Sequence, residues 1–418
     1  MLKNYLIISF KVFIRRKFYT FISLFGISFA LMVLMVFFAL YENAFGNIPP
    51  QSNNDRILTT TFVQFGGRIS SRISSPGYVL LKHYLKVHTL PRIKGASIFS
   101  SNSSVDLVFH DRTIKVSRKR TDGGFWKIFD FRFLEGRPLT AEDEKNANYA
   151  AVINESTQKK LFGNKSPLGA FIELEGQPFR IVGVVPDVPS IRDIPYADIW
   201  VPLSTAKTKA YLKDGVFGNF NAVALAQKRA DIPLIKKEYS ERLQRLDYPV
   251  PEPWMYAKGR LETYFELGAR STLNKQGLLD KTYANKFRIV LLIGIFIFVF
   301  LPTINLININ LSRILERASE IGVRRAFGAS TRVLVAQFIV ENILLTLIGG
   351  ILAFGLSWGT LLVLNIFPIE PFTNLRFNFL IFFYGFAVTI LFGVISGVYP
   401  AWKMSRRHPV AALYRGTM

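Results

Sequence analysis

The residues that could carry out catalysis or bind a metal are few and scattered. The chain has no cysteine, which excludes disulfides, thiolate zinc sites and cysteine nucleophiles. Its four histidines, at positions 83, 88, 110 and 408, do not fall at the spacings of metal ligands. The stretch "GNKS" contains part of a phosphate-loop pattern, but Asn164 precedes Lys165 where that loop requires glycine. Asp122 and Asp130 are predicted to be surface or turn residues. We therefore expect no catalytic residue, no metal ligand and no enzyme activity on this chain.

A different chemistry, that of a docking surface, is indicated by the stretch "ERASEIGVRRAFGAS", residues 316–330. Ala318, Gly322 and Ala326 lie four residues apart, so on a helix they form one stripe that another surface can approach closely. Gly328 is typical of a helix end. Charged residues flank the stripe and can form directional ion pairs: Glu316, Glu320, Arg324 and Arg325. Two interpretations stay open here, a short helix that docks into a groove and a basic loop that contacts only lipid headgroups and water.

The elements that must position this segment are strongly apolar. Of all residues, 50% are hydrophobic and 14% are aromatic, which favours membrane segments over a polar soluble protein. A bilayer crossing needs about 20 apolar residues. Four segments meet this length, and we predict transmembrane helices at 18–41, 287–309, 333–367 and 377–402. The first is too long for the apolar core of a signal peptide and lacks a small-residue cleavage site, so we expect it to be retained.

The net charge of +23 is distributed in a way that predicts orientation. Residues 1–17, the loop 310–332 and the tail 403–418 are rich in lysine and arginine, and four crossings put all three on one side. The positive-inside rule makes that side cytoplasmic, with both termini there. The large segment 42–286 and the short loop 368–376 are then outside. Zinc-finger, basic-zipper and RNA-binding patterns are missing from the sequence, so nucleic acid is not an expected partner.

The first 17 residues allow two interpretations. Leu2, Leu6, Ser9 and Phe13 lie near one face of a helix, with Lys3 and Lys11 elsewhere. This pattern predicts an amphipathic helix that lies among the cytoplasmic headgroups. A plain basic flank of the first transmembrane helix fits equally well.

The outer segment 42–286 has mixed composition and predicts an α+β domain with its own core, divided into two subdomains. Residues 149–163 predict a strand followed by a short helix that ends near Gly163. Residues 170–188 predict a hairpin with its turn at "EGQP", and residues 215–227 predict a further strand. In residues 232–246, four apolar residues at helical spacing predict a helix: Leu234, Ile235, Tyr239 and Leu243.

The stretch "ILERASEIGVRRAFGAS" resembles the loop after the second helix in MacB/FtsX-type permeases, the membrane subunits of mechanotransmitting (type VII) ABC transporters. The residues that match the family pattern are Glu320, Ile321, Gly322, Arg324, Arg325, Ala326, Gly328 and Ala329. The outer stretch from "FRFLEGRPLTAEDE" to "FRIVGVVPDV" is similar to the outer domain of the macrolide-exporter branch. The ending "GVYPAWKMSRRHPVAALYRG" resembles the usual end of the family. The resemblance covers nearly the whole chain.

The resemblance implies a coupling helix at 316–330 that sits in a groove of an ATPase. Glu320, Arg324 and Arg325 would make polar contacts there, and Ile321 and Ala326 apolar ones. The macrolide exporters carry their ATPase ahead of helix one, whereas no nucleotide-binding loop is present in this sequence. The resemblance therefore implies a separate ABC ATPase dimer that binds ATP and Mg²⁺, with no cofactor on this chain. It also implies a second permease subunit, identical or paralogous, and location in the bacterial inner membrane with the large domain in the periplasm.

Small residues at four-residue spacing mark close helix packing or a dimer seam. They are Gly26 and Ala30 in the first helix, Gly355 and Gly359 in the third, and Gly393 and Gly397 in the fourth. The same spacing recurs in unrelated membrane proteins, so the packing interpretation is not specific to this family. Glu341 is predicted to be interfacial and paired with an arginine such as Arg332.

Two kinds of function remain open. The first is transport, in which ATP-driven movement of the outer domain exports or extracts amphiphilic, peptide-like, antibiotic or lipoprotein cargo at the outer face. The large outer domain favours it, and a periplasmic adaptor is then a conceivable partner. The alternative is regulation, in which the chain transmits force to a partner such as a cell-wall hydrolase, or senses a peptide or antibiotic, and moves no substrate.

Overall fold

The structure, a computed structural model, describes residues 2–87, 90–213, 215–245, 254–273, 283–316, 323, 327 and 330–405. The chain divides into two compact units, which are described separately. Unit 1 comprises Met1–Tyr41, Arg288–Pro368 and Leu375–Met418, and unit 2 comprises Glu42–Phe287 and Ile369–Asn374. The chain therefore passes between the units four times, after residues 41, 287, 368 and 374.

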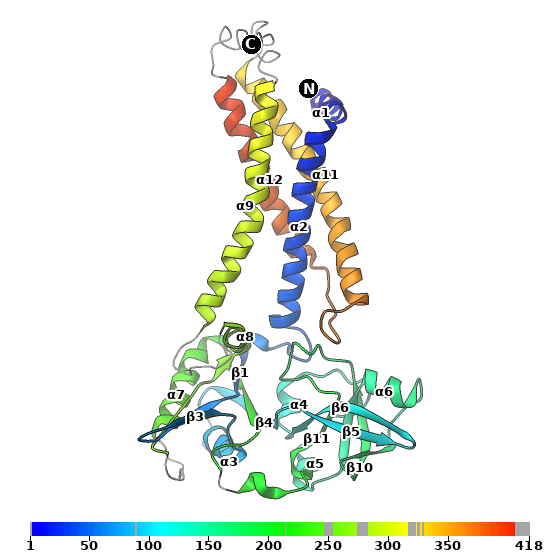
Figure 1. Ribbon diagram of the computed structural model, residues 1–418, viewed down its shortest axis with the longest axis vertical. Helices are drawn as coiled ribbons and strands as arrows, with labels where there is room; N and C mark the ends of the chain where they lie inside the picture. The colour runs from blue at the N-terminus through cyan, green and yellow to red at the C-terminus, as the bar shows by residue number, and fades with distance from the viewer. Residues whose placement is uncertain are drawn as a thin grey trace. The chain divides into compact units, whose positions relative to one another are not determined.

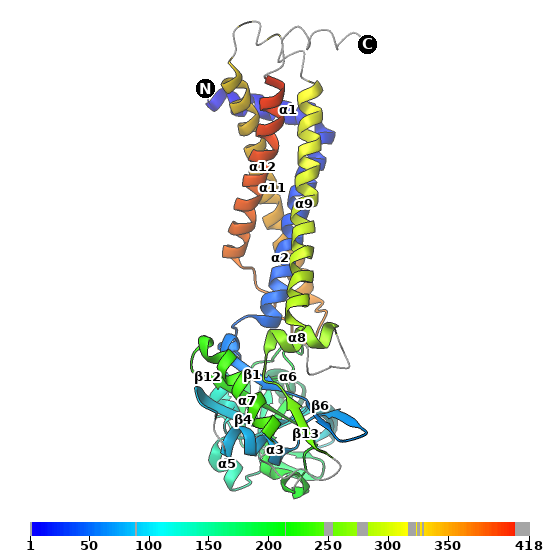
Figure 2. The ribbon, with the colours of Figure 1, turned by 90° about the vertical axis from the view of Figure 1, so that its left-hand side faces the viewer.

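Unit 1 is built from long helices with high apolar content (Figures 1 and 2). They are α1 (Leu2–Arg15), α2 (Lys17–Phe45), α9 (Ala284–Glu316), α11 (Thr331–Ile366) and α12 (Phe379–Ser405). Among the described residues, two stretches are long and apolar enough to cross a membrane, Lys17–Phe45 and Val335–Ile366. Helices are present at all four predicted places, but the count of four crossings stays a prediction.

The core of unit 1 lies where α2 meets α11 and α12. Ile27 and Leu31 of α2 are buried in one cluster with Leu345 of α11 and Phe382 of α12. Phe13 of α1 joins this cluster, and Figure 2 shows α1 running across the bundle at a steep angle to α2. Of the face predicted for α1, Ser9 and Phe13 are buried within the chain.

Unit 2 is an α+β domain, as predicted. Its strands are β1 (Ile57–Thr60), β2 (Val63–Gly66), β3 (Ser71–Ser74), β4 (Ile93–Ser100), β5 (Ser103–Phe109), β6 (Arg112–Thr121), β7 (Glu135–Gly136), β8 (Ala150–Asn154), β9 (Phe171–Leu174), β10 (Gln177–Val185), β11 (Ile199–Pro202), β12 (Phe220–Ala226), β13 (Tyr256–Gly259) and β14 (Glu262–Thr263). Its helices are α3 (Tyr78–Leu81), the π-helical η2 (Lys82–Val87), α4 (Phe125–Ile128), α5 (Ala141–Lys145), α6 (Glu155–Phe162), α7 (Ile232–Arg245) and α8 (Tyr264–Leu273). Short 3₁₀ turns lie at η1 (Asn54–Arg56), η3 (Leu203–Thr205), η4 (Lys209–Leu212) and η5 (Arg229–Asp231).

The local predictions for the outer domain are confirmed. β8 leads into α6, whose first turn is capped by Asn154 Oδ1 and whose end is Gly163 with a φ of 62°. β9 and β10 form the predicted antiparallel hairpin, and β12 and α7 lie where they were expected. One detail is wrong: Leu234 is exposed, because only Ile235, Tyr239 and Leu243 face the core from α7.

Six strands of unit 2 close into a small barrel. The ladder runs β11–β8–β10–β9–β5–β6, and a parallel pairing of β6 with β11 closes it. Alternate residues face inward, as the twofold period of a strand requires, and they form one apolar cluster. Val116 of β6, Ile153 of β8 and Ile181 of β10 belong to it. The opposite faces of β8 and β11 carry Val152 and Trp200, which join a second core.

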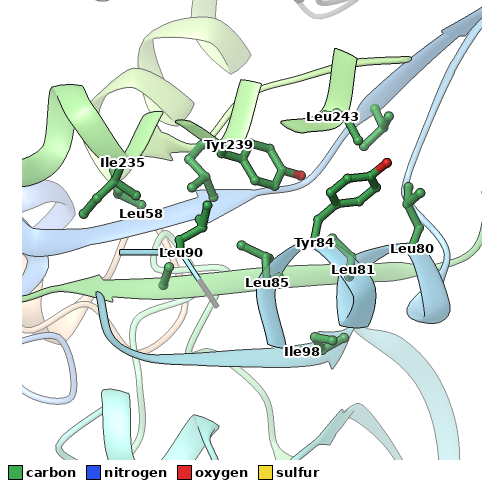
Figure 3. Close-up of a cluster of buried hydrophobic side chains, with 14 of the residues drawn as sticks. Leu58, Leu80, Leu81, Tyr84, Leu85, Leu90, Ile98, Ile235, Tyr239 and Leu243 are labelled. Carbon is green, nitrogen blue, oxygen red and sulfur yellow. The ribbon is translucent and has the colours of Figure 1, made fainter. Parts of the chain in front are cut away.

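A second layer of sheet extends from β6 through β4, β12, β1 and β14. On β12, Ala222 and Ala224 face a core beneath α7 and η2, whereas Val223 and Leu225 face the core shared with the barrel. Figure 3 shows the first of these cores, with Ile235 and Tyr239 of α7 on one side and Leu81 and Tyr84 on the other. Unit 2 is therefore a stack in which one sheet has an apolar core on each face.

Asp122 lies in a turn, as predicted, although its side chain is buried there. It sits in the turn after β6 and is 5% exposed. Its carboxylate accepts hydrogen bonds from the Ile98, Gly124 and Phe125 amides and from the Ser97 hydroxyl, and it also pairs with Lys86. These donors compensate the burial of the charge. Asp130 is exposed, as predicted, and accepts from the Ser52 amide.

Candidate functional site

The predicted coupling segment lies between the end of α9 and the start of α11. Glu316 is the last residue of α9, and Ser330 is the N-cap position of α11. The other residues predicted to contact an ATPase lie outside the described residues: Glu320, Ile321, Gly322, Arg324, Arg325, Ala326, Gly328 and Ala329. Their roles stay predictions.

Two described residues of this segment add a feature that the sequence prediction missed. The Phe327 amide donates to the Val323 carbonyl oxygen at 3.1 Å, which is one helical turn. Residues four apart share a helix face, and here both are exposed, Val323 by 46% and Phe327 by 89%. A large apolar side chain is thus exposed within a segment whose sequence is otherwise rich in charge. Phe327 is the only aromatic residue of 316–330, and that was the signal available in the sequence.

The glycine pairs predicted for helix packing fall in different surroundings. A Cβ at Gly393 of α12 would lie 2.9 Å from Thr346 Oγ1 of α11, so these two helices approach closely there. A Cβ at Gly355 or Gly359 would meet nothing within 4 Å of the described chain. Ala30 is buried and Gly26 half-buried in α2, and Gly397 lies within α12. Their roles in packing or dimer formation stay predictions.

A glycine that the sequence prediction missed makes the tightest described contact between α11 and α2. A Cβ at Gly349 would lie 2.7 Å from Cγ2 and 3.0 Å from Cβ of Ile27, closer than real carbon atoms come. Gly349 precedes Gly350, whose Cβ would meet the Phe386 ring of α12. The pair "GG" in an apolar segment was the available signal.

Glu341 is buried in the helix bundle and does not lie beside Arg332, and its place at the membrane interface stays a prediction. The side chain is 2% exposed inside the helix bundle. Both residues belong to α11, nine positions apart, so they lie on opposite faces with a rise of about 13 Å between them. Gln337, Asn342 and Thr346 are buried on the same helix. α11 therefore carries a polar face into the bundle.

In unit 2, one loop gathers an unusual number of polar contacts. We call residues 186–198, between β10 and β11, the junction loop. Lys119 of β6 binds this loop, because its Nζ donates hydrogen bonds to the Asp193 carbonyl oxygen at 2.7 Å and to the Ile194 carbonyl oxygen. The Lys119 side chain is 1% exposed and lies over the Phe99 ring. Burial lowers the pKa of its ammonium group to about 7, against a smaller opposite effect of Asp193.

This buried lysine predicts a pH dependence of stability. Below pH 7 the folded and unfolded chains both hold the proton, whereas between pH 7 and the ordinary value of 10.5 only the unfolded chain does. The free energy of unfolding of unit 2 therefore rises with pH in that window, by at most about 1.4 kcal/mol per unit. Urea unfolding of wild type and Lys119→Met, followed by tryptophan fluorescence from pH 6 to 9.5, measures this. The variant is expected to lose the rise, and parallel pH profiles would contradict the prediction.

Comparison with known proteins places this fold in a family. A family model for the MacB-like periplasmic core domain matches residues 20–241, and a model for the FtsX-like permease C-terminal region matches residues 292–409. The first match alone covers more than half of the chain. The chain belongs to the MacB/FtsX-type family of ABC transporter permeases, and the resemblance inferred from residues 316–330 is confirmed.

The chain is similar to several individual proteins. The "Uncharacterized ABC transporter permease YknZ" of Bacillus subtilis is 26% identical over 76% of this chain and 74% of its own length. The "Macrolide export ATP-binding/permease protein MacB" of Pasteurella multocida is 29% identical over 77% of this chain and 46% of its own length. The chain thus spans about half of that relative. The solved periplasmic region of MacB from Actinobacillus actinomycetemcomitans is 19% identical, with a TM-score of 0.38, over 53% of this chain and 94% of its own.

Proposed function

We propose that this chain is the permease subunit of an ABC transporter whose ATP hydrolysis takes place on a separate ATPase dimer. In this proposal four helices cross the inner membrane, both termini are cytoplasmic, and unit 2 lies in the periplasm. ATP-driven closure of the ATPase pair moves the inner ends of the helices, and the movement is used by unit 2. The proposal needs a second permease subunit, identical or paralogous, to face the second ATPase.

The observation that carries this proposal is the combination of charged and exposed apolar residues in the segment between α9 and α11. It combines the family residues Glu320, Arg324 and Arg325 with an exposed apolar turn at Val323 and Phe327. Interfaces typically combine an apolar residue at the centre with charged residues at the rim, and the composition of this segment fits that pattern.

For the cargo, we propose export or extraction at the outer face of the inner membrane. The name of the MacB relative assigns macrolide export to that protein. An amphiphilic antibiotic, a peptide or a lipoprotein is the corresponding class for this chain. The match of the C-terminal region to an FtsX-like model supports a second candidate, force transmission to a periplasmic partner without transport.

The test of the ATPase interaction is co-purification. Arg324→Glu combined with Arg325→Glu is expected to lower the recovered ATPase more than about tenfold, because it places like charges across the interface. The matched control reverses two lysines of α1, Lys3→Glu with Lys11→Glu, which changes the net charge equally. Unchanged recovery in the arginine variant, or equal loss in the control, would sink the assignment.

A further inference from the structure

The junction loop, residues 186–198, contacts the chain near each place where unit 2 continues into a long helix. Those places are the end of α2, the segment before Arg288 and the short loop Ile369–Asn374. All contacts described below lie within unit 2. The partners of the loop come from five separate stretches of sequence, so the fold, and not proximity along the chain, brings them to this loop.

Arg192 is the centre of this convergence. Its side chain is 1% exposed, and all three of its nitrogens donate hydrogen bonds. Nε donates to the Asn43 carbonyl oxygen at 2.8 Å, Nη1 to that of Ile48 at 3.0 Å, and Nη2 to that of Gly46 at 3.0 Å. Further bonds reach the Glu42 carbonyl oxygen and Gln51 Oε1. The guanidinium therefore serves as the cap of the carboxyl end of α2.

The chemistry of this cap explains why an unpaired charge can be buried. The last carbonyl groups of a helix lack partners within the helix, and the helix dipole places partial negative charge there. Burial lowers the pKa of Arg192, but the guanidinium stays charged at any physiological pH. Each partner named above is a neutral oxygen. Arg192 thus needs the helix end in one position, because only there are enough oxygens aimed at it.

The same loop holds the short loop Ile369–Asn374. The Ser190 amide donates to the Pro371 carbonyl oxygen at 3.1 Å, and the Ser190 hydroxyl donates to Glu370 Oε2 at 3.0 Å. The rings of Tyr196 and Phe372 lie 6.3 Å apart. The loop that joins α11 to α12 is thereby fixed to the loop that caps α2.

The third connection runs through α8. The Tyr264 hydroxyl donates to the Ile191 carbonyl oxygen at 3.4 Å. The next residue, Phe265, packs edge-on against Phe45 at 5.4 Å and lies 5.5 Å from Phe287. Phe45 ends α2 and Phe287 is in the first turn of α9, so three aromatic rings join the ends of both helices to α8.

The junction loop is anchored in the barrel at its other end. Lys119 of β6 holds the Asp193 and Ile194 carbonyl groups, as described above. Asp198 Oδ2 accepts from the Ser117 amide at 2.8 Å, and Asp198 Oδ1 accepts from Asn154 Nδ2 at 3.1 Å. β6 and β8 are barrel strands, so the junction loop contacts both the barrel and the end of α2.

We infer that Arg192 is a positioning residue that fixes the outer ends of the helices to the barrel, so that displacement of those ends moves unit 2 as one block. The inference rests on the proposed function, because it assigns a role within ATP-driven movement. Without the guanidinium, the end of α2 loses its cap and can turn relative to the junction loop. ATP hydrolysis then continues while its effect on unit 2 is lost.

The test separates hydrolysis from movement in the reconstituted permease–ATPase complex. Amide hydrogen exchange of unit 2 is compared between nucleotide-free and ATP-trapped complexes, together with the ATPase rate. Arg192→Ala is expected to keep the ATPase rate within about twofold and to lose most of the nucleotide-dependent difference in exchange. Arg192→Lys, which keeps the charge but fewer donors, is expected to keep part of that difference.

A stability control distinguishes positioning from a general loss of folding. Arg120, 8% exposed, donates to Thr205 of η3 and to Glu175 in the turn after β9, neither of which belongs to the junction loop. Arg120→Met is expected to lower stability and to keep the nucleotide-dependent difference. If Arg192→Ala does not fold, Arg192→Lys takes its place, and a partial loss of the nucleotide-dependent difference is expected.

The outcomes are distinct. A wild-type response in Arg192→Ala, or in Arg192→Lys where Arg192→Ala does not fold, overturns the inference and leaves the proposed function intact. An equal loss of response in Arg120→Met overturns it too, because stability alone would then explain the effect. A wild-type complex that forms but shows no nucleotide-dependent change in unit 2 overturns the proposed function, and the inference with it.

Discussion

Phe327→Asp is expected to weaken the binding of the ATPase by about 30-fold to 1,000-fold, which corresponds to about 2–4 kcal/mol. The Phe327 side chain is 89% exposed in the single chain, so a partner can bury nearly all of it. A buried phenylalanine removes about 150–250 Å² from water, at about 25 cal/mol per Å². Aspartate removes this gain and places a charge in the centre of the contact. Titration of the purified permease with its ATPase measures the change.

Two control variants accompany Phe327→Asp, one that keeps an apolar side chain at this position and one that changes another exposed phenylalanine. Phe327→Leu keeps an apolar side chain and is expected to lose less than about tenfold in affinity. Phe367→Asp changes a phenylalanine that is 74% exposed at the other end of α11, and it is expected to leave ATPase binding unchanged. Equal affinities of wild type and Phe327→Asp would show that the exposed turn does not dock, and the coupling role of 316–330 would then rest on the charges alone.

The outer domain shows which parts of the fold can be predicted from local sequence patterns. The β9–β10 hairpin and the β8–α6 unit were predictable because turn residues, strand periodicity and helix caps all lie within a few residues. Closure of the barrel could not be predicted from the sequence. It depends on β6 pairing with β11, and Arg118 and Ile199, which are partners there, are separated by about 80 residues of sequence. No local pattern encodes such a pairing, since many strands of similar composition compete for it.

The stretch "SRKR" of β6 shows a second limit. In sequence it is a run of basic residues, which usually means a solvated face. In the structure Lys119 and Arg120 are buried, and the Arg118 side chain is nearly so. Arg118 and Arg120 share Glu175, which comes from the turn after β9, while Lys119 points to the opposite face and finds two carbonyl groups. The partners that make burial possible are distant in sequence, so composition alone gives the wrong environment.

Arg192 was missed for the same reason. It stands in "PSIRDIP" as a single charged residue of a loop, and nothing local indicates that five oxygens surround it. Its partners, residues 42–51, lie about 150 positions away. The family resemblance was recognised from residues 316–330, because they form a contiguous motif, whereas it carried no information on this long-range cap.

Gly349→Leu is expected to prevent normal assembly of the helix bundle. The added side chain begins at a Cβ that lies 3.0 Å from the Cβ of Ile27, and a β-branched residue of a helix cannot move that atom without moving the backbone of α2. Overpacking of this kind costs about 1–3 kcal/mol and often more when backbone must shift. We expect a lower yield of folded protein in detergent and a melting temperature several degrees lower.

Gly355→Leu is the matched control, on the same helix with the same change in helix propensity. Its Cβ meets nothing within 4 Å in the described chain, so the bundle of a single chain is expected to keep its stability. If Gly355 instead lies at a dimer seam, as its spacing with Gly359 predicts, the variant will fold normally and lose self-association. Size measurement by light scattering in detergent separates these outcomes. A folded, fully associated Gly355→Leu variant would exclude Gly355 from the seam, and a stable Gly349→Leu variant would refute the close contact of α2 with α11.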